Sequence, residues 1–518
     1  MLSTLAITVA LLTGAGRGDT TLQQQPVIWE DLADTDIFRV NDTFYYSAST
    51  MHYSPGAPIL SSKDLVHWEF IGHSVPTLDW GSKYSLQDGS AYVQGIYAST
   101  IRARPSDGQW FWVGCVEYSS TYVYTASGPT EDWTQLAHIP ECYYDSGLLF
   151  DDDGTPYVAY GSSEIKVAQL SDDLKSHVRA ESVYTYDNSA EGSRMYKIDG
   201  TYYILNIDPT SRIQYALKSD SPFGPYDSAI VSNSPACPSD VGDPPHQGGI
   251  VDDGDGNWYY MAFCDSYPGG RVPVLAPIVF NDQGFPQLAD VNTWPSSVTV
   301  PLDEVSTPDF SYTDSFTGSG LSAQWEWNHN PDTSAYSLDN GLILNTVTVT
   351  DDLYQARNTL THRALGPSSA ATIELDFSSM QSGDRAGLVI LRDSSAWVGV
   401  IDNGDSKVVG VWKGLDMTSG DGGWSTVDTG SLETSEDIGD STVIYLRARG
   451  NFRPSSDKTV QFSYSTDGST FSDIGEPFVM NTEWEFFMGY RYGIFNFATE
   501  SLGGSVKVSS FTMEAVEE

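Results

Sequence analysis

The sequence predicts an all-β protein in which a five-bladed β-propeller is followed by a β-sandwich. Its 518 residues are enough for two or three domains. Its 30 Tyr, 21 Phe, 14 Trp and 47 Gly are typical of many short strands joined by tight turns. Helical periodicity is nearly absent, and one aromatic hairpin pattern recurs through the first 300 residues.

Residues 1–18 predict a signal peptide, ahead of the first blade. The short apolar run Leu5–Leu12 precedes Ala15, Gly16 and Gly18, which are small enough for a peptidase site. No positive charge precedes this run, and a buried first strand is the alternative interpretation. We expect a secreted, extracellular protein.

Four cysteines agree with an oxidising compartment. They allow three disulfide pairings, and the sequence does not choose among them. They are Cys115, Cys142, Cys237 and Cys264.

Five hairpins define residues 26–300 as the propeller. In each, a turn containing Asp is followed by an aromatic-rich strand, and the aromatic markers stand 46 to 66 residues apart. A unit of about fifty residues with three or four strands has the length of a propeller blade. An ordinary sandwich with similar hairpins is the alternative, but the regular spacing favours blades. The hairpins are Asn41–Tyr46, Asp107–Trp112, Asp153–Val158, Asp199–Ile204 and Asp255–Tyr260.

The repeat ends near Pro301. Residues 301–313 are rich in Pro, Ser, Thr and Asp and are expected to form a linker. Residues 314–518 lack the fifty-residue period and predict a two-sheet sandwich of the jelly-roll or concanavalin-like kind. Its expected strands include Leu342–Leu344, Ala371–Phe377, Ala386–Leu391, Val443–Arg449, Val460–Tyr464 and Val506–Thr512.

The charge balance excludes two classes of partner. The chain has 26 Lys and Arg against 69 Asp and Glu, a net charge of −43. That leaves too few cations for binding nucleic acid and disfavours an anionic membrane surface. No later apolar run approaches the roughly 20 residues of a membrane helix. Because 40% of residues are hydrophobic, disorder is a poor interpretation. We expect a monomer.

Three acidic residues precede or open an apolar strand that leads to a hairpin turn: Asp34, Asp145 and Glu191. Because they hold equivalent positions in blades one, three and four, we expect them at one end of the same channel. Asp31 and Asp36 are alternatives to Asp34 with a sufficient role in turn bonding.

These segments resemble the three acidic motifs of glycoside hydrolase family 43. The resemblance includes Gly270–Pro277 at the end of the last blade, and it spans residues 26–300 in order. The tail is similar to the concanavalin-like sandwich that follows some of these propellers, notably at Trp325–Asp332 and Ala356–Leu360.

The resemblance implies an inverting mechanism. Asp34 would be the general base that deprotonates water, and Glu191 the general acid that protonates the departing oxygen. Asp145 would raise the pKa of Glu191 and orient it. This chemistry requires no cofactor.

The resemblance also implies three further site residues. Arg271 would keep Asp145 ionised and contact the sugar, which is compatible with a structural ion pair. His246 stands where the family often has a histidine beside a central cation, so it could bind substrate and a structural Ca²⁺. The alternatives are Gln247 at that position or a histidine that only fills the core. Tyr97 replaces a common Trp and could be a sugar platform.

Three stretches are similar to secreted fungal members of the family: Cys142–Asp145, Pro245–Gly249 and Asp265–Arg271. This similarity implies an α-L-arabinofuranosidase that removes 1,3-linked arabinose from doubly substituted xylose in arabinoxylan, a plant cell-wall polysaccharide. A β-xylosidase acting on xylo-oligosaccharides is the alternative. A lectin would not need the three acids, and the G-x-S-x-G and H-E-x-x-H motifs are absent. We expect the sandwich to support the propeller rather than bind glycan.

Overall fold

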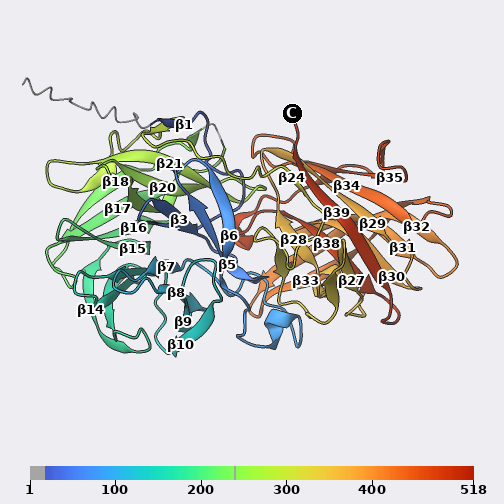
Figure 1. Cartoon of the computed structure of the whole chain (residues 1–518), viewed down its shortest axis with the longest axis horizontal. Helices are drawn as coiled ribbons and strands as arrows, with labels where there is room; N and C mark the ends of the chain where they lie inside the picture. Colours follow the sequence, from blue (N-terminus) through green and yellow to red (C-terminus); the bar gives the residue numbers. More distant parts are fainter. Residues whose placement is uncertain (1–17, 239–240, 518) are drawn as a thin grey trace, which may run out of the picture.

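The computed structural model confirms the predicted all-β architecture of propeller and sandwich. Figure 1 shows the propeller in blue to green beside the sandwich in yellow to red. The structure describes residues 18–238 and 241–517, so nearly all of the predicted signal peptide lies outside the described residues. Within these ranges, no helix combines the length and apolar character needed to cross a membrane. Three short 3₁₀ turns lie within these ranges: η1 (Ser82–Ser85), η3 (Leu353–Gln355) and η4 (Trp484–Phe486).

The propeller consists of five antiparallel sheets of four strands each. Blade 1 contains β2 (Asp36–Val40), β3 (Thr43–Ser47), β5 (Gly56–Ser62) and β6 (Trp68–Val75). Blade 2 contains β7 (Thr100–Ala103), β8 (Trp110–Val116), β9 (Ser120–Ala126) and β10 (Thr134–Ile139). Blade 3 contains β11 (Gly147–Phe150), β12 (Pro156–Tyr160), β13 (Glu164–Leu170) and β14 (His177–Thr185). Blade 4 contains β15 (Glu191–Ile198), β16 (Thr201–Asp208), β17 (Ile213–Ser219) and β18 (Asp227–Asn233). Blade 5 contains β19 (His246–Asp252), β20 (Trp258–Asp265), β21 (Arg271–Phe280) and β22 (Pro286–Leu288).

The Asp-Gly turns join the first two strands of blades, as the sequence predicts. In blade 4, Asp199 and Gly200 have φ of 49° and 83°, and the flanking Ile198 and Thr201 are paired. Two successive left-handed residues give a two-residue turn that matches the right-handed twist of the strands. Most of the aromatic residues after such turns, Tyr203 among them, are buried.

The ring closes where β19 packs against β2. A small sheet joins the two ends of the propeller, because β1 (Thr20–Leu22) pairs antiparallel with β23 (Val298–Val300). Thus β1 lies before residue 26, where the propeller was expected to begin.

The sandwich core lies between two large sheets and includes the buried Leu388, Val398, Ile444, Phe462 and Phe511. The first sheet contains β24 (Tyr312–Asp314), β26 (Tyr336–Leu338), β27 (Leu342–Asn345), β29 (Ser368–Asp376), β34 (Val443–Asn451), β35 (Thr459–Ser465), β36 (Ser472–Asp473), β37 (Phe478–Val479) and β39 (Ser505–Ala515). The second contains β25 (Glu326–Asn328), β28 (Leu360–Arg363), β30 (Asp384–Leu391), β31 (Ser394–Asp402), β32 (Lys407–Gly420), β33 (Gly423–Asp437) and β38 (Arg491–Ala498), and it is completed by β4 (Tyr53–Ser54).

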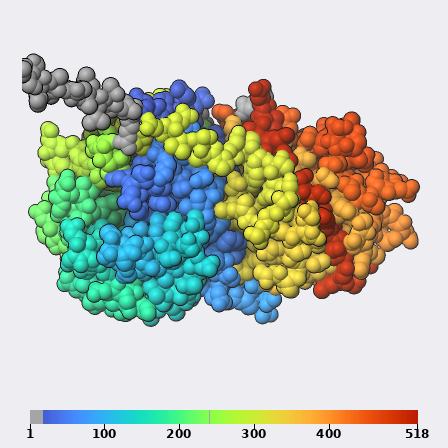
Figure 2. Space-filling view, in the orientation of Figure 1, coloured from blue at the N-terminus to red at the C-terminus, as the bar shows by residue number. Residues whose placement is uncertain are grey.

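The propeller itself supplies β4, which lies between two strands of blade 1 and pairs with β25 of the sandwich. Figure 2 shows the start of the sandwich, in yellow, lying directly against the first blade, in blue. A sheet that continues across the boundary fixes the sandwich on this side of the propeller.

A buried ion cluster lies beside this shared sheet. Glu326 accepts hydrogen bonds from Arg363 Nη2 at 2.9 Å and Arg491 Nη1 at 2.6 Å, and it contacts His73 Nε2 at 3.0 Å. Arg363 Nε also donates to the backbone carbonyl of Asp31 at 2.9 Å. The cluster therefore connects the sandwich to the segment that leads into blade 1.

Candidate active site

Asp34, Asp145 and Glu191 line one cavity of about 1160 Å³. Asp34 precedes β2, Asp145 precedes β11, and Glu191 is the first residue of β15. The structure thus brings together the three acids that the sequence selected, at the beginning of three inner strands.

The local backbone places these acids. Asp34 and Asp145 have φ of 60° and 50°, a left-handed conformation that Asp adopts more readily than most residues. Glu191 is followed by a β-bulge, because it pairs with Ile207 while Arg194 pairs with Leu205. Such bulges redirect side chains beside functional sites.

Asp34 is held by two donors. Its Oδ1 lies 3.1 Å from Arg271 Nη1, and Ser49 Oγ donates to its Oδ2. Arg271 was expected to keep Asp145 ionised, but the structure pairs it with Asp34 and the pKa of Asp145 is raised. Arg271 is tied to the segment before blade 1 instead, since its backbone N–H donates to Asp31 Oδ1 at 2.7 Å.

Asp145 is almost fully buried, and its Oδ2 accepts hydrogen bonds from Gly192 N at 3.2 Å and Gln247 Nε2 at 3.4 Å. Burial raises the pKa of Asp145 well above its usual range, and the charges of Glu191 and Asp34 raise it further. Arg194 opposes this rise in pKa.

Glu191 accepts a hydrogen bond at 2.7 Å from Tyr144 Oη. Burial also raises the pKa of Glu191; the Tyr144 hydrogen bond opposes this rise and the charge of Asp34 adds to it. Burial is therefore the main cause of the raised pKa of Glu191, which the sequence attributed to Asp145. Because both pKa values are raised, the Asp145–Glu191 pair retains a proton where an isolated carboxyl would have lost it.

Tyr97 also lines the cavity. Its hydroxyl donates to the Val93 carbonyl at 2.7 Å, and its ring centroid lies 4.9 Å from that of Tyr118. Tyr118 is 58% exposed. The two rings form an aromatic wall on the blade 2 side.

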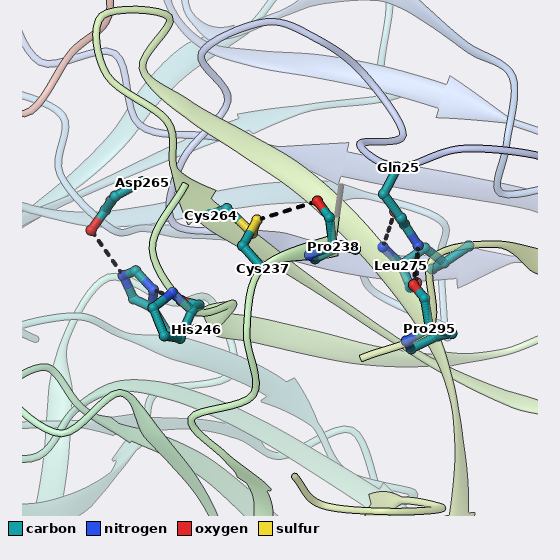
Figure 3. The surroundings of a disulfide bond; sticks show 9 residues. Gln25, Cys237, Pro238, His246, Cys264, Asp265, Leu275 and Pro295 are labelled. Carbon is teal, nitrogen blue, oxygen red and sulfur yellow. Dashed lines mark hydrogen bonds and ion pairs between the residues drawn. A yellow bond between two sulfur atoms is a disulfide. The ribbon is translucent and has the colours of Figure 1, made fainter. Parts of the chain in front are cut away.

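His246 lies on the cavity lining, but its surroundings do not fit a cation. Its Nδ1 lies 2.8 Å from the Pro244 carbonyl, and its Nε2 lies 3.2 Å from Arg212 Nη1. Figure 3 shows His246 directed toward Asp265, at 3.8 Å, and Arg212 pairs with that same carboxylate at 2.8 Å. Burial lowers the pKa of His246. The described ranges contain no group of three or more His, Cys, Asp or Glu that could hold a metal. Arg212, which sequence reasoning missed, places a positive charge beside His246 and pairs with the carboxylate of Asp265, so the expected Ca²⁺ would be repelled there.

The disulfides join Cys115 to Cys142 and Cys237 to Cys264, which settles the pairing that the sequence left open. Cys142 stands three residues before Asp145, and Cys237 itself lines the cavity. Figure 3 shows the second bond beside His246. Each disulfide attaches a cavity loop to a blade strand.

The sandwich contributes to the same cavity, which the sequence did not predict. Its contribution is Pro454, Ser455, Thr482, Glu483, Trp484 and Phe487. A second cavity of about 490 Å³ lies between blade 2 and the sandwich. The two cavities share four aromatic residues: Tyr97, Tyr118, Trp484 and Phe487.

Comparison with known proteins agrees with this architecture. Residues 23–286 match the family model described as glycosyl hydrolases family 43, and residues 313–514 match the β-xylosidase C-terminal concanavalin A-like domain. A β-xylosidase of Formosa agariphila is 26% identical over 94% of this chain and 90% of the relative. A non-reducing end α-L-arabinofuranosidase of Bacteroides ovatus is 25% identical over 74% of this chain and 77% of the relative.

One solved structure is similar over its whole length. It is described as an engineered GH43 glycoside hydrolase with both endo-xylanase and exo-arabinofuranosidase activity. It is 42% identical, covers 96% of this chain and 100% of its own, and superimposes with a TM-score of 0.92.

Proposed function

This chain belongs to glycosyl hydrolases family 43, and on that premise we propose that it is an inverting α-L-arabinofuranosidase. The proposed reaction removes 1,3-linked L-arabinofuranose from doubly substituted xylose in arabinoxylan. The observation that carries the proposal is the second cavity, which adjoins the acidic one across a shared aromatic wall.

The proposed chemistry uses two proton transfers. Asp34 accepts a proton from a water molecule, whose oxygen attacks the anomeric carbon of the arabinose. Glu191 donates its proton to the glycosidic oxygen as the C–O bond breaks. The raised pKa of Glu191 supports the acid role, because a general acid must still hold its proton near the working pH. No cofactor enters this scheme.

Two neighbours support these roles. The carboxyl of Asp145, ionised or sharing a proton, lies beside Glu191. The Gly192 amide donates to this carboxyl and holds it in position. Arg271 is paired with Asp34 at 3.1 Å, which holds the carboxylate of the proposed base in place. We propose that its guanidinium also contacts the sugar, together with Tyr97.

The paired cavities favour a branched substrate. A doubly substituted xylose carries a second pentose beside the one that is removed, and this pentose needs space next to the catalytic cavity. The 490 Å³ cavity offers that space, with Tyr97 and Tyr118 on the shared wall. A β-xylosidase that acts on xylo-oligosaccharides is the second candidate, favoured by the 26% identical relative of that activity.

We also propose that the protein is secreted. The support is its two disulfides, a kind of bond that persists in oxidising compartments.

The test is product analysis by ¹H NMR on arabinoxylan oligosaccharides that differ only in single or double substitution of one xylose. We expect arabinose from the doubly substituted oligosaccharide, appearing first as the anomer inverted relative to the substrate. Release of xylose from xylobiose without arabinose from either oligosaccharide would establish the β-xylosidase alternative.

A further inference from the structure

Arg194 lies directly behind the three acids of the cavity. It belongs to β15, three residues after Glu191, and its side chain is 1% exposed. The β-bulge between these two residues breaks the strand pairing at this point. Neither the cavity lining nor the proposed proton transfers include Arg194.

Each nitrogen of the Arg194 guanidinium donates to a backbone carbonyl. Nη2 donates to Asp34 O at 2.7 Å, Nε donates to Thr35 O at 3.1 Å, and Nη1 donates to Ser146 O. One acceptor belongs to the first acid, and another directly follows Asp145. One side chain on the strand of Glu191 thus holds the segments that carry the other two acids.

The backbone around Arg194 is closely packed between blades 3 and 4. Gly147 packs so tightly on β15 that a Cβ atom there would lie 2.5 Å from Ser193 O and 2.8 Å from Arg194 Cα. Ser193 N donates to Asp145 O at 2.8 Å. Blades 3 and 4 therefore meet backbone to backbone beside Arg194, without a side chain between them.

The contacts require a guanidinium rather than any positive charge. Its planar group holds donors in fixed directions, whereas an ammonium is a compact point charge that cannot reach carbonyls on both sides. The carboxylate that faces Arg194 most closely is that of Asp36, whose Oδ1 lies 3.7 Å from Nε. Three hydrogen bonds to carbonyls offset much of the cost of burying this charge.

We infer that Arg194 is a positioning residue that sets the spacing of Asp34, Asp145 and Glu191 by linking blades 1, 3 and 4. The inference rests on the proposed function, because it assumes that these three acids perform the reaction. A shift of about 1 Å between reacting groups can reduce turnover roughly 10²-fold. The spacing of the acids is therefore expected to govern kcat more than substrate binding.

The test compares Arg194→Lys and Arg194→Met with Arg102→Met, on a pentoside that the wild-type protein hydrolyses. Arg102 is a matched control because its side chain is only 11% exposed and pairs with Asp36, at 2.7 Å, yet it contacts neither acid-bearing carbonyl. Thermal unfolding of each variant gives the folded fraction. Kinetics are then measured on folded protein, so a loss of stability is separated from a loss of positioning.

We expect Arg194→Lys to reduce kcat about 10²-fold with KM changed less than threefold, while Arg102→Met keeps kcat within threefold. Arg194→Met removes the charge as well, so its pH–rate profile should also move to higher pH, whereas that of Arg194→Lys should not. Wild-type kcat in Arg194→Lys, or an equal loss in Arg102→Met, would overturn the inference. Glu191→Gln is measured in parallel, because full activity in that variant would reject the proposed function itself.

Discussion

The cavity that holds the three acids and the interface between the domains both bury carboxylates, with opposite effects on their pKa values. In the cavity, burial raises the pKa of Asp145 and Glu191. At the interface, burial alone would raise the pKa of Glu326, but the guanidiniums of Arg363 and Arg491 outweigh it and hold the pKa well below its usual range. The difference lies in which acceptor the arginine nitrogens contact.

The cavity also has arginines close by, but they are directed elsewhere. Arg194 donates to backbone carbonyls, and Arg271 pairs with Asp34. Within the part of the chain that the structure describes, Asp145 and Glu191 therefore have no hydrogen-bonded cation, and burial keeps a proton on the pair. At the interface, direct pairing produces a fixed charge that stabilises the fold and is unsuited to proton transfer.

Glu30 shows the same rule inside the interface. It is fully buried beside Arg363 and Arg491, but both arginines bond to Glu326, and Glu30 Oε1 has no hydrogen-bond partner within the described part of the chain. Burial raises the pKa of Glu30 to about 8. The charges of Arg363 and Arg491 lower the pKa of Glu30, but they do not outweigh the effect of burial because their hydrogen bonds go to Glu326.

The largest effect should come from Glu191→Gln, which removes the proposed proton donor from the cavity. General acid catalysis contributes about 10²–10⁴-fold, so we expect a loss of turnover near the upper end for substrates with poor leaving groups. Stability should not fall, because the amide replaces a carboxyl that is costly to ionise. Rates on natural oligosaccharides and on an aryl pentoside, with unfolding curves, check this. Equal losses on both substrates would reject the acid role.

Glu326→Gln should have the opposite effect to Glu191→Gln, because it is expected to reduce stability rather than turnover. It leaves two buried guanidiniums without their carboxylate, and breaking such a group costs roughly 3–5 kcal/mol. The measurement is urea unfolding at neutral pH. Glu181→Gln is the control, since Glu181 pairs with Arg179 on the surface and should contribute no more than about 1 kcal/mol. If Glu326→Gln lowered the free energy of unfolding no more than the control does, the interface cluster would not contribute to stability as proposed.

Glu30→Gln should change how stability depends on pH. Because the folded-state pKa of Glu30 is raised to about 8, its protonated form favours folding, and stability is lost as the pH rises from the unfolded value of 4.5 toward 8. The slope approaches about 1.4 kcal/mol per pH unit for one group. The glutamine variant should lose this slope and become more stable than wild type at pH 8. Parallel stability curves for both proteins would contradict the prediction.

The sequence predicts the blades and the three acids because both signals are local. An Asp-Gly turn followed by aromatic residues specifies a hairpin within six residues, and each acid stands directly before its own strand. The ring then brings equivalent strand positions together. The local pattern left Asp31 and Asp36 as alternatives, and the resemblance to the three acidic motifs of family 43 selected Asp34, Asp145 and Glu191.

Other parts of the site depend on contacts between distant segments. The pairing of Arg271 with Asp34 follows from ring closure, and the donation from Arg194 depends on close packing at Gly147. Trp484 and Phe487 reach the cavity from the sandwich, almost 300 residues after Glu191. Neither a motif nor a periodicity marks these residues, so the sequence alone could not assign them.

Trp484→Ala tests whether Trp484 of the sandwich contacts the substrate in the cavity or stabilises the interface between the domains. Trp484 is 57% exposed and lines both cavities, so its ring can contact sugar while adding little to the fold. An aromatic contact of about 1 kcal/mol predicts a roughly fivefold higher KM on arabinoxylan, with little change on an aryl pentoside or in stability. Val178→Ala, at a site 55% exposed on blade 3, is the control for loss of exposed apolar surface. If Trp484→Ala instead lowers stability and leaves KM on the polymer unchanged, Trp484 stabilises the domain interface. Substrate contacts would then come from the propeller and Phe487.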